Sequence, residues 1–232
     1  MKMNKINCDL QECILCRRCL PEWLPAIRAN RKNYNLKKGE LLFREGDTVT
    51  GMYFIYSGKV KVHKKWGAEK ELIVRIAGKG DIVGHRGLGG DVIYPVSGTA
   101  LEPVTVCFID LPFFQATLKM NHDFLYELMM FYARELKESE NNMRNMAHMP
   151  VKNRVAHVLL ELQKKFGKTQ EGFIEIVLSK QDLSSFVGAA YETVFRSVKE
   201  LKEEAIVDAE GKQIKILDDK KLEAVFSSLP FQ

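Results

Sequence analysis

In the first half of the chain, apolar residues occur in short runs that are interrupted by glycine. Twelve of the sixteen glycines fall between residues 33 and 111. Short apolar runs at even spacing with Gly turns are typical of sandwiches, jelly rolls and barrels. We therefore expect an antiparallel β domain, with strands at residues 41–43, 51–56, 59–62, 71–76, 80–83 and 104–109.

A single long helix is predicted over residues 121–148, because this stretch contains neither Gly nor Pro. Asn121 can cap its start, and its apolar positions alternate in steps of three and four, which is typical of a coiled-coil seam. The set expected to pair with a second copy of the helix is Leu128, Tyr132, Leu136, Ser139, Met143 and Met146. The set expected to pack against its own chain is Phe124, Met129 and Phe131. The alternative is a long helix buried within one domain.

The last part of the chain has the pattern of a compact α/β unit. An amphipathic helix is expected over residues 151–166, a strand over 173–178, and two short helices over 180–186 and 190–203. Gly188 lies between the two short helices, which gives the layout of a helix-turn-helix motif. Two further apolar runs, at 206–207 and 213–217, would form a wing. The fold class predicted is thus α+β, with four segments: a cysteine loop and short helix at 1–32, the β domain at 33–111, the dimerisation helix at 112–149 and the winged helix-turn-helix at 150–232.

Composition agrees with a globular protein of two domains. The chain has 232 residues, of which 46% are hydrophobic and 28% charged. No apolar run approaches the roughly 18 residues of a membrane span, and we expect a cytoplasmic protein. The five histidines show no metal-ligand or nucleophile–base spacing, so an enzyme is not expected.

The net charge of +5 is not by itself evidence for a nucleic-acid partner. Residues 1–40 hold nine Lys or Arg against four Asp or Glu, whereas residues 150–232 hold thirteen of each. The segment with the helix-turn-helix pattern is therefore neutral, and a prediction of DNA binding depends on particular side chains.

Four of the five cysteines lie in the first nineteen residues, and this crowding indicates a metal site rather than disulfides. Cys13, Cys16 and Cys19 have the spacing with which a short loop places three thiolates around a cube-shaped iron–sulfur cluster, the fourth ligand coming from elsewhere. Zinc sites more often use two separate Cys-x2-Cys pairs. Zinc, thiol-redox chemistry and no metal all stay open, and Cys107 alone would more often be a buried core thiol.

The second short helix is the expected DNA reader. Glu192 and Arg196 are four residues apart, so they share one face near its N-terminus. Glu can accept a hydrogen bond from cytosine N4, and Arg can donate two to guanine. An ordinary surface ion pair is the competing interpretation. The candidates for contacts to DNA phosphates are Lys180, Thr193, Ser197 and Lys199.

Several turn sequences in the β domain, in this order, resemble those of the CRP/FNR regulators. They are Lys38-Gly39-Glu40, Glu45-Gly46-Asp47, Tyr56-Ser57-Gly58-Lys59-Val60 and Gly80-Asp81-Ile82-Val83-Gly84. The resemblance covers about residues 30–220. It implies a cyclic-nucleotide-binding-like β-roll, a dimer helix and a winged helix-turn-helix that binds a palindromic operator, with RNA polymerase as a further partner. The stretch Glu192-Thr193-Val194-x-Arg196 is similar to the family's recognition-helix signature. Tyr191 and Phe195 depart from it, and we expect both to bind DNA by facing or flanking the groove, where aromatic rings can contact thymine methyl groups.

The resemblance also bears on the ligand. Nucleotide-binding members place a Glu and an Arg-Ser or Arg-Thr pair around the cyclic phosphate, whereas this chain has His85-Arg86 and Val96-Ser97 there. Binding of cyclic AMP is therefore not expected.

Among the family, the FNR-type oxygen regulators hold a [4Fe–4S] cluster with three N-terminal cysteines and one in the β-roll, and the context of Cys107 is similar to that fourth position. This implies a cluster on Cys13, Cys16, Cys19 and Cys107 that responds to oxygen or nitric oxide. Because the spacing differs from the enterobacterial pattern, Cys8 is the alternate ligand.

Overall fold

The computed structural model describes residues 2–4, 13–67 and 70–227. The chain divides into two compact units, Met1–Lys137 and Glu138–Gln232. The boundary between them falls inside the long helix α4 (His122–His148). None of the described helices is both long and apolar enough to cross a membrane.

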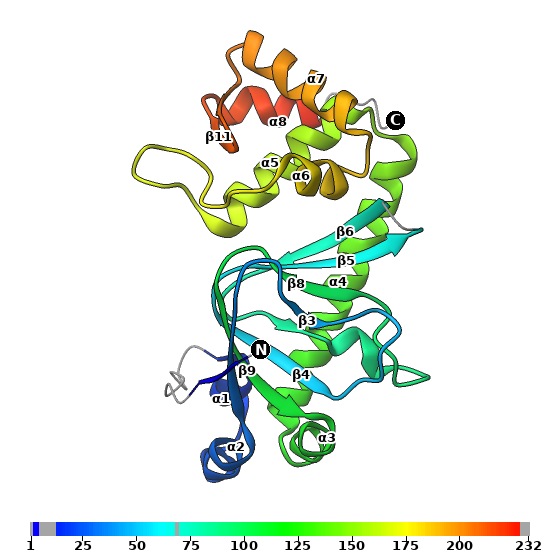
Figure 1. Ribbon diagram of the computed structural model, residues 1–232, viewed down its shortest axis with the longest axis vertical. Helices are drawn as coiled ribbons and strands as arrows, with labels where there is room; N and C mark the ends of the chain where they lie inside the picture. The colour runs from blue at the N-terminus through cyan, green and yellow to red at the C-terminus, as the bar shows by residue number, and fades with distance from the viewer. Residues whose placement is uncertain (1, 5–12, 68–69, 228–232) are drawn as a thin grey trace. The chain divides into compact units, whose positions relative to one another are not determined.

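The first unit is a β-roll of two antiparallel sheets (Figure 1). One sheet has the strand order β1-β2-β9-β4-β7, and the other β3-β8-β5-β6. The strands of the roll are β1 (Lys2–Asn4), β2 (Lys32–Leu36), β3 (Leu41–Phe43), β4 (Gly51–Ser57), β5 (Val60–Trp66), β6 (Lys70–Ala77), β7 (Ile82–Val83), β8 (Ser97–Ala100) and β9 (Val104–Asp110). All six expected strands are present. The first, second and eighth were not foreseen, because they are short or mostly polar.

Short helices precede the second strand of the roll, follow its last strand and, in one case, lie between β7 and β8. They are α1 (Ile14–Arg18), η1 (Pro21–Trp23), α2 (Leu24–Asn30), η2 (His85–Leu88) and α3 (Leu111–Met120). Helix α3 begins where the Asp110 side chain accepts a hydrogen bond from the Phe113 amide at 2.9 Å, and Pro112 fits its first turn. The helix predicted over residues 121–148 is present as α4, and the segment 112–149 assigned to dimerisation also contains α3. The structure separates them, since Asn121 breaks the helical conformation and α4 starts after it.

The second unit contains the helix-turn-helix and its wing. Its elements are α5 (Val151–Phe166), α6 (Lys180–Val187), α7 (Tyr191–Glu203), β10 (Val207–Glu210), β11 (Gln213–Ile216) and α8 (Asp219–Ser227). Ser179 caps α6 by accepting from the Asp182 amide at 3.0 Å, and Gly188, with φ +70°, ends the helix in a left-handed conformation. The fold class predicted from the sequence is confirmed.

One expected strand, at residues 173–178, does not form. Phe173 and Ile174 form isolated bridges to Lys215 and Lys168, and the Ile174 amide donates to the Ile214 carbonyl at 2.9 Å. The alternation of apolar residues is real, since the side chains of Ile174 and Ile176 are buried, but they fill the core beside the wing without a continuous ladder.

Helix α4 has two apolar faces, and the structure corrects which of them packs against its own chain. Leu128 is only 4% exposed and belongs to the core of the β-roll with Phe124, while the Tyr132 hydroxyl donates to the His85 carbonyl. Conversely, Met129 was expected to be buried and is 55% exposed. The predicted pairing seam is therefore wrong in its first half, because the two stripes are one residue apart on the helix and the β-roll covers the one that contains Leu128.

The apolar stripe left exposed has the three-four spacing of a seam. We call it the outer stripe of α4, and its residues are Tyr126, Met129, Ala133, Leu136, Glu140, Met143 and Ala147. Leu136 and Met143 were members of the predicted seam and are each 61% exposed. Ser139 is intermediate in burial and Met146 is 36% exposed, so these two lie at the side of the stripe.

Candidate functional site

The solvent face of α7 brings together most of the residues that the sequence predicted to meet DNA. Val194, Val198 and Leu201 are buried and anchor the helix. The opposite face is wet because of the 3.6-residue period. Its residues include Glu192, Arg196 and Lys199, all exposed, and Tyr191 and Phe195. Side chains near the start of such a helix are the ones that reach base edges in a helix-turn-helix protein.

Two predicted phosphate contacts come out differently. Ser197 is 5% exposed and its hydroxyl donates to the Thr193 carbonyl at 3.1 Å, so the prediction that it contacts a phosphate is wrong. A serine within a helix commonly hydrogen-bonds in this way to the backbone carbonyl four residues earlier. Lys199 is exposed and loosely paired with Glu203 at 3.6 Å, which leaves it available for an anion.

Tyr191 and Phe195 form a stacked pair whose ring centroids are 4.7 Å apart with an interplanar angle of 26°. The Lys180 ammonium, from the start of α6, lies 5.1 Å from the centroid of Phe195 and 5.9 Å from that of Tyr191. Position in the sequence does not join Lys180 to the two rings. Only the structure shows that they form one group, because the contact joins the two helices of the helix-turn-helix.

Arg154 of α5 fixes the turn between these helices. Its guanidinium donates to the carbonyls of Val187 and Gly188, each at 3.0 Å, at the C-terminal end of α6. A cation there also suits the helix dipole. Periodicity assigned α5 to the core, and nothing in the sequence pattern pointed to Arg154.

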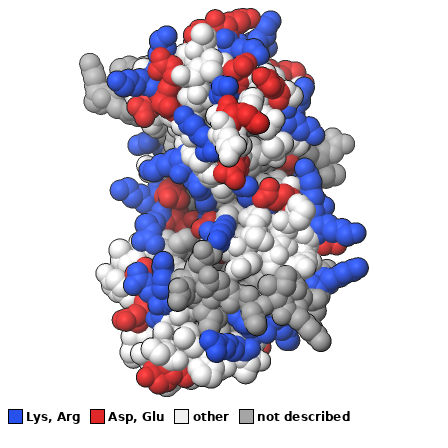
Figure 2. Space-filling model, turned by 90° about the vertical axis from the view of Figure 1, so that its left-hand side faces the viewer, with Lys and Arg blue, Asp and Glu red and all other residues white. Residues whose placement is uncertain are grey.

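Acidic and basic side chains are interspersed on the surface that Figure 2 shows. This agrees with the neutral balance of residues 150–232. An even mixture on this face gives little long-range attraction to a polyanion.

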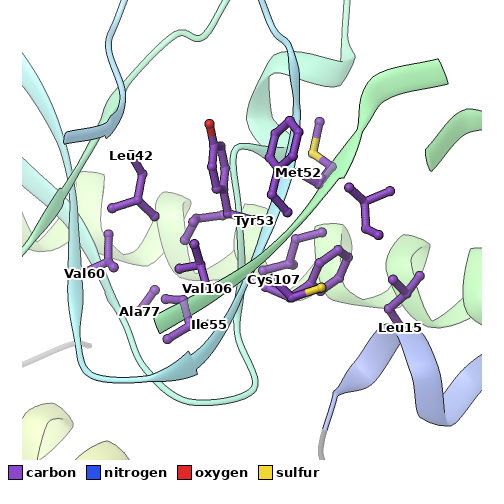
Figure 3. Close-up of a cluster of buried hydrophobic side chains, with 14 of the residues drawn as sticks. Leu15, Leu42, Met52, Tyr53, Ile55, Val60, Ala77, Val106 and Cys107 are labelled. Carbon is purple, nitrogen blue, oxygen red and sulfur yellow. The ribbon is translucent and has the colours of Figure 1, made fainter. Parts of the chain in front are cut away.

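The second group of candidate residues is the set of thiols. Cys13 and Cys19 are the N- and C-cap residues of α1, and Cys16 lies within this helix, so the three follow one another at one-turn intervals. All three are buried, and Cys107 on β9 is 2% exposed. Figure 3 shows Cys107 among the buried side chains of the β-roll, a cluster that also contains Leu15 of α1. Cys8 lies outside the described residues.

Cys13 and Cys107 line the same cavity, of about 10 Å³, between α1 and the β-roll. A hydrogen bond from Cys16, together with backbone donors, lowers the pKa of Cys13 to about 7 against the opposing effect of burial. Burial, followed by the charge of Cys13, raises the pKa of Cys19 to about 12. Within residues 2–4, 13–67 and 70–227, no three potential ligands are grouped as a metal site. The chemistry of the four thiols suits a thiolate-bound metal, although the described thiols are not grouped as a complete site.

Three contacts attach the thiol segment to α3 and α4. The Leu20 amide, next to Cys19, donates to the side chain of buried Asn121 at 2.8 Å. Trp23 donates its indole N–H to the Thr117 hydroxyl at 3.1 Å, and Arg18 pairs with Glu127 at 3.0 Å. These partners are 94 to 109 residues apart in the chain, so no local signal could have identified them.

The residues at the expected cyclic-phosphate positions are engaged within the first unit. Arg86 pairs with Glu135 of α4 at 2.8 Å. Ser97 is buried and accepts a hydrogen bond from the Glu45 amide at 2.9 Å. Arg86 therefore takes part in an ion pair of the fold.

His85 packs beside the Arg86–Glu135 ion pair, and its burial leads us to expect that the stability of the fold depends on pH. Burial and the charges of Arg75 and Arg86 lower its pKa from 6.5 to about 3. Its ring also lies 3.9 Å from Glu135 and meets Phe131 edge-on. Below pH 6.5 the unfolded chain binds a proton on His85, whereas the folded chain does not until the pH approaches 3. The contribution of neutral His85 to the free energy of unfolding is therefore complete above pH 6.5 and is lost as the pH falls toward 3.

We expect His85 to account for about 2 kcal/mol of lost stability between pH 7 and pH 5. Urea unfolding of the wild type and of His85→Phe at both values measures it, because carboxylates contribute equally to both proteins. An identical pH dependence in the two proteins would show that the imidazole is protonated in the fold.

Comparison with known proteins agrees with the two units. The cyclic nucleotide-binding domain family matches residues 34–121, and the Crp-like helix-turn-helix domain family matches residues 153–225. The anaerobic regulatory protein of Bacillus subtilis (strain 168) is 30% identical over 217 residues, which are 91% of this chain and 90% of that protein. The transcriptional activator protein anr of Pseudomonas aeruginosa is 28% identical over 221 residues, which are 91% and 90% of the two chains. The structure of FixK2 from Bradyrhizobium japonicum superposes with a TM-score of 0.77 at 20% identity, covering 86% of this chain and 98% of that one.

Proposed function

Because the chain belongs to the Crp/Fnr family of DNA-binding transcription regulators, which are not enzymes, we propose that it is an oxygen- or nitric-oxide-responsive member of that family. In this proposal it binds a palindromic operator as a homodimer. Its sensor is a [4Fe–4S] cluster held by Cys13, Cys16, Cys19 and Cys107, with Cys8 as the alternate ligand. A relative named for anaerobic regulation supports this direction.

The observation that carries the proposal is that Cys13, at the start of α1, lines the same cavity as Cys107 of the β-roll, while Cys16 and Cys19 follow Cys13 at one-turn intervals. Four cysteine thiolates are the usual ligand set of such a cluster, which supplies a centre that oxygen and nitric oxide attack. The lowered pKa of Cys13 favours the deprotonated form that ligation requires.

The contacts of the thiol segment support a path from this centre to the dimer helix. Leu20 and Arg18 flank Cys19, and their partners Asn121 and Glu127 lie at the start of α4. A change in the position of α1 would therefore alter what holds the first turns of α4. A molecular switch needs an element whose position responds to a local chemical change. Here the element would be the start of α4, and the change would occur at the cysteines of α1.

The outer stripe of α4 supports pairing with a second copy of this chain. Its exposed apolar residues, Met129, Leu136 and Met143, have seam spacing. Glu140 is exposed in the same stripe, so the carboxylates of two copies would meet and keep the pairing marginal. Pairing would place two α7 helices about 34–36 Å apart, one turn of DNA.

On the operator, we propose that Glu192 accepts from a cytosine and Arg196 donates to a guanine of each half-site. Lys180, Thr193 and Lys199 would contact phosphates, which fix the position of α7 without specifying sequence. RNA polymerase is the proposed protein partner of the operator-bound dimer.

Anaerobic purification followed by iron and acid-labile sulfide analysis tests the sensor. We expect about four iron and four sulfide per chain, lost after a pulse of air. Replacing Cys107 by Ser should remove most of the iron. Leu101→Ala, a truncation of another buried side chain of the β-roll, is the control that should keep it.

Sedimentation and operator binding before and after air test the coupling. We expect the dimer and its tight binding to be lost together with the iron. A chain that stays dimeric and binds its site equally well without iron would refute the coupling. An iron-free protein containing zinc would move the sensor to that metal.

A reversible disulfide bond between Cys13 and Cys16 would indicate thiol-redox sensing instead of a cluster. The hydrogen bond between these two thiols supports this alternative. Binding of a metabolite in the β-roll, with activity unchanged by Cys107→Ser, would favour an effector-binding regulator.

A further inference from the structure

We propose that Tyr191, Phe195 and Lys180 form a thymine-reading site, in which the stacked rings contact the 5-methyl group of a thymine beside the base pair read by Arg196. The inference deepens the proposed role of α7, on which it rests. It assigns specificity to residues outside the Glu192–Arg196 pair.

The two rings are held in place by contacts within the chain. They stack on each other at 4.7 Å, and the Lys180 ammonium lies within 6 Å of both centroids. Cation–π attraction of this kind fixes side chains that would otherwise rotate freely at a surface. A rigid apolar group loses little conformational entropy on binding, so its contacts discriminate well.

The position of the pair supports DNA as its occupant. Tyr191 and Phe195 are the neighbours of Glu192 and Arg196 in the chain and lie on the same exposed side of α7. The ring of Tyr191 remains 37% exposed although it is stacked. An ordinary i,i+4 hydrophobic pair would explain the stacking, but it does not explain two aromatic rings at the first turns of a helix that a DNA-binding family places in the major groove.

Among the groups that the major groove presents, the thymine methyl is the apolar one. The ring faces cannot stack on bases there, because the bases of a duplex are stacked on one another. Cytosine lacks the methyl group and adenine presents polar atoms, so an apolar contact selects thymine. The Lys180 ammonium stays next to the rings and adds positive charge toward the adjacent phosphate.

The test compares thymine with deoxyuridine, which differs only by the missing methyl group. The full-length protein, in the form that binds DNA, first selects a preferred palindrome from a random pool. Each thymine of that palindrome is then replaced symmetrically by deoxyuridine, and the Kd is measured at constant salt. We expect one thymine per half-site, beside the guanine read by Arg196, whose replacement weakens binding about tenfold, since one buried methyl in each half-site is worth roughly three- to fourfold.

Phe195→Ala and Tyr191→Ala should lose this difference between thymine and deoxyuridine, whereas Phe195→Leu should keep part of it. Lys199→Ala is the matched control, because it should weaken binding to all duplexes and leave the ratio unchanged. If the wild type binds thymine and deoxyuridine duplexes equally at every position, the inference fails and the roles of Glu192 and Arg196 stand. If no sequence is selected at all, both fail together.

Discussion

Replacing Arg196 by Ala is expected to abolish sequence-specific binding while leaving the fold intact. The side chain is exposed on α7 and is not among the buried residues that anchor this helix. A bidentate contact to guanine is worth about 1–3 kcal/mol, and the proposed dimer would lose it in both half-sites. We therefore expect the specific Kd to rise by about 30-fold to 10⁴-fold, measured by fluorescence anisotropy on the selected palindrome.

Two controls separate base reading from general weakening. Lys199→Ala, one turn further along α7, should reduce specific and non-specific binding alike and make both less dependent on salt. Ser197→Ala should leave the affinity unchanged, because the Ser197 hydroxyl bonds within α7. If Arg196→Ala lowers the affinity for random and selected DNA by the same factor, Arg196 contacts a phosphate.

Replacing Glu135 by Ala is expected to destabilise the first unit strongly. Glu135, 10% exposed, accepts from Arg75 at 3.1 Å and from Arg86 at 2.8 Å. Arg75 also pairs with Asp81 and donates to the Ile82 carbonyl. Removing one partner of a buried ion pair leaves an uncompensated charge, and it costs about 3–5 kcal/mol.

Urea unfolding measures this cost. Glu138→Ala, three residues along α4 and exposed, is the matched control and should change stability by no more than about 0.5 kcal/mol. A second variant, Glu135→Gln, keeps the shape and removes the charge, so it should also destabilise strongly. Equal stability of Glu135→Ala and Glu138→Ala would mean that Asp81 alone compensates Arg75.

The sequence by itself determined the features that depend on neighbouring residues. The two helices of the helix-turn-helix follow from local periodicity, and the turn follows from Gly188, which takes a left-handed conformation that other residues adopt at a cost. The strands of the β-roll follow from apolar runs between glycines. The crowding of Cys13, Cys16 and Cys19 is likewise visible in the chain, since a spacing of three residues brings side chains to one side of a short helix.

The tertiary structure alone decided which surfaces are covered. Two apolar stripes on α4 are one residue apart, and periodicity cannot tell which one the β-roll buries. The fold buries Leu128 and leaves Met129 exposed, the reverse of what was expected. The contacts of Glu135 with Arg75 and Arg86, and of Asn121 with Leu20, join residues 49 to 101 positions apart. Contacts between residues so far apart in the chain form only when the intervening segment folds back on itself. A short stretch of sequence therefore does not show which residues will meet.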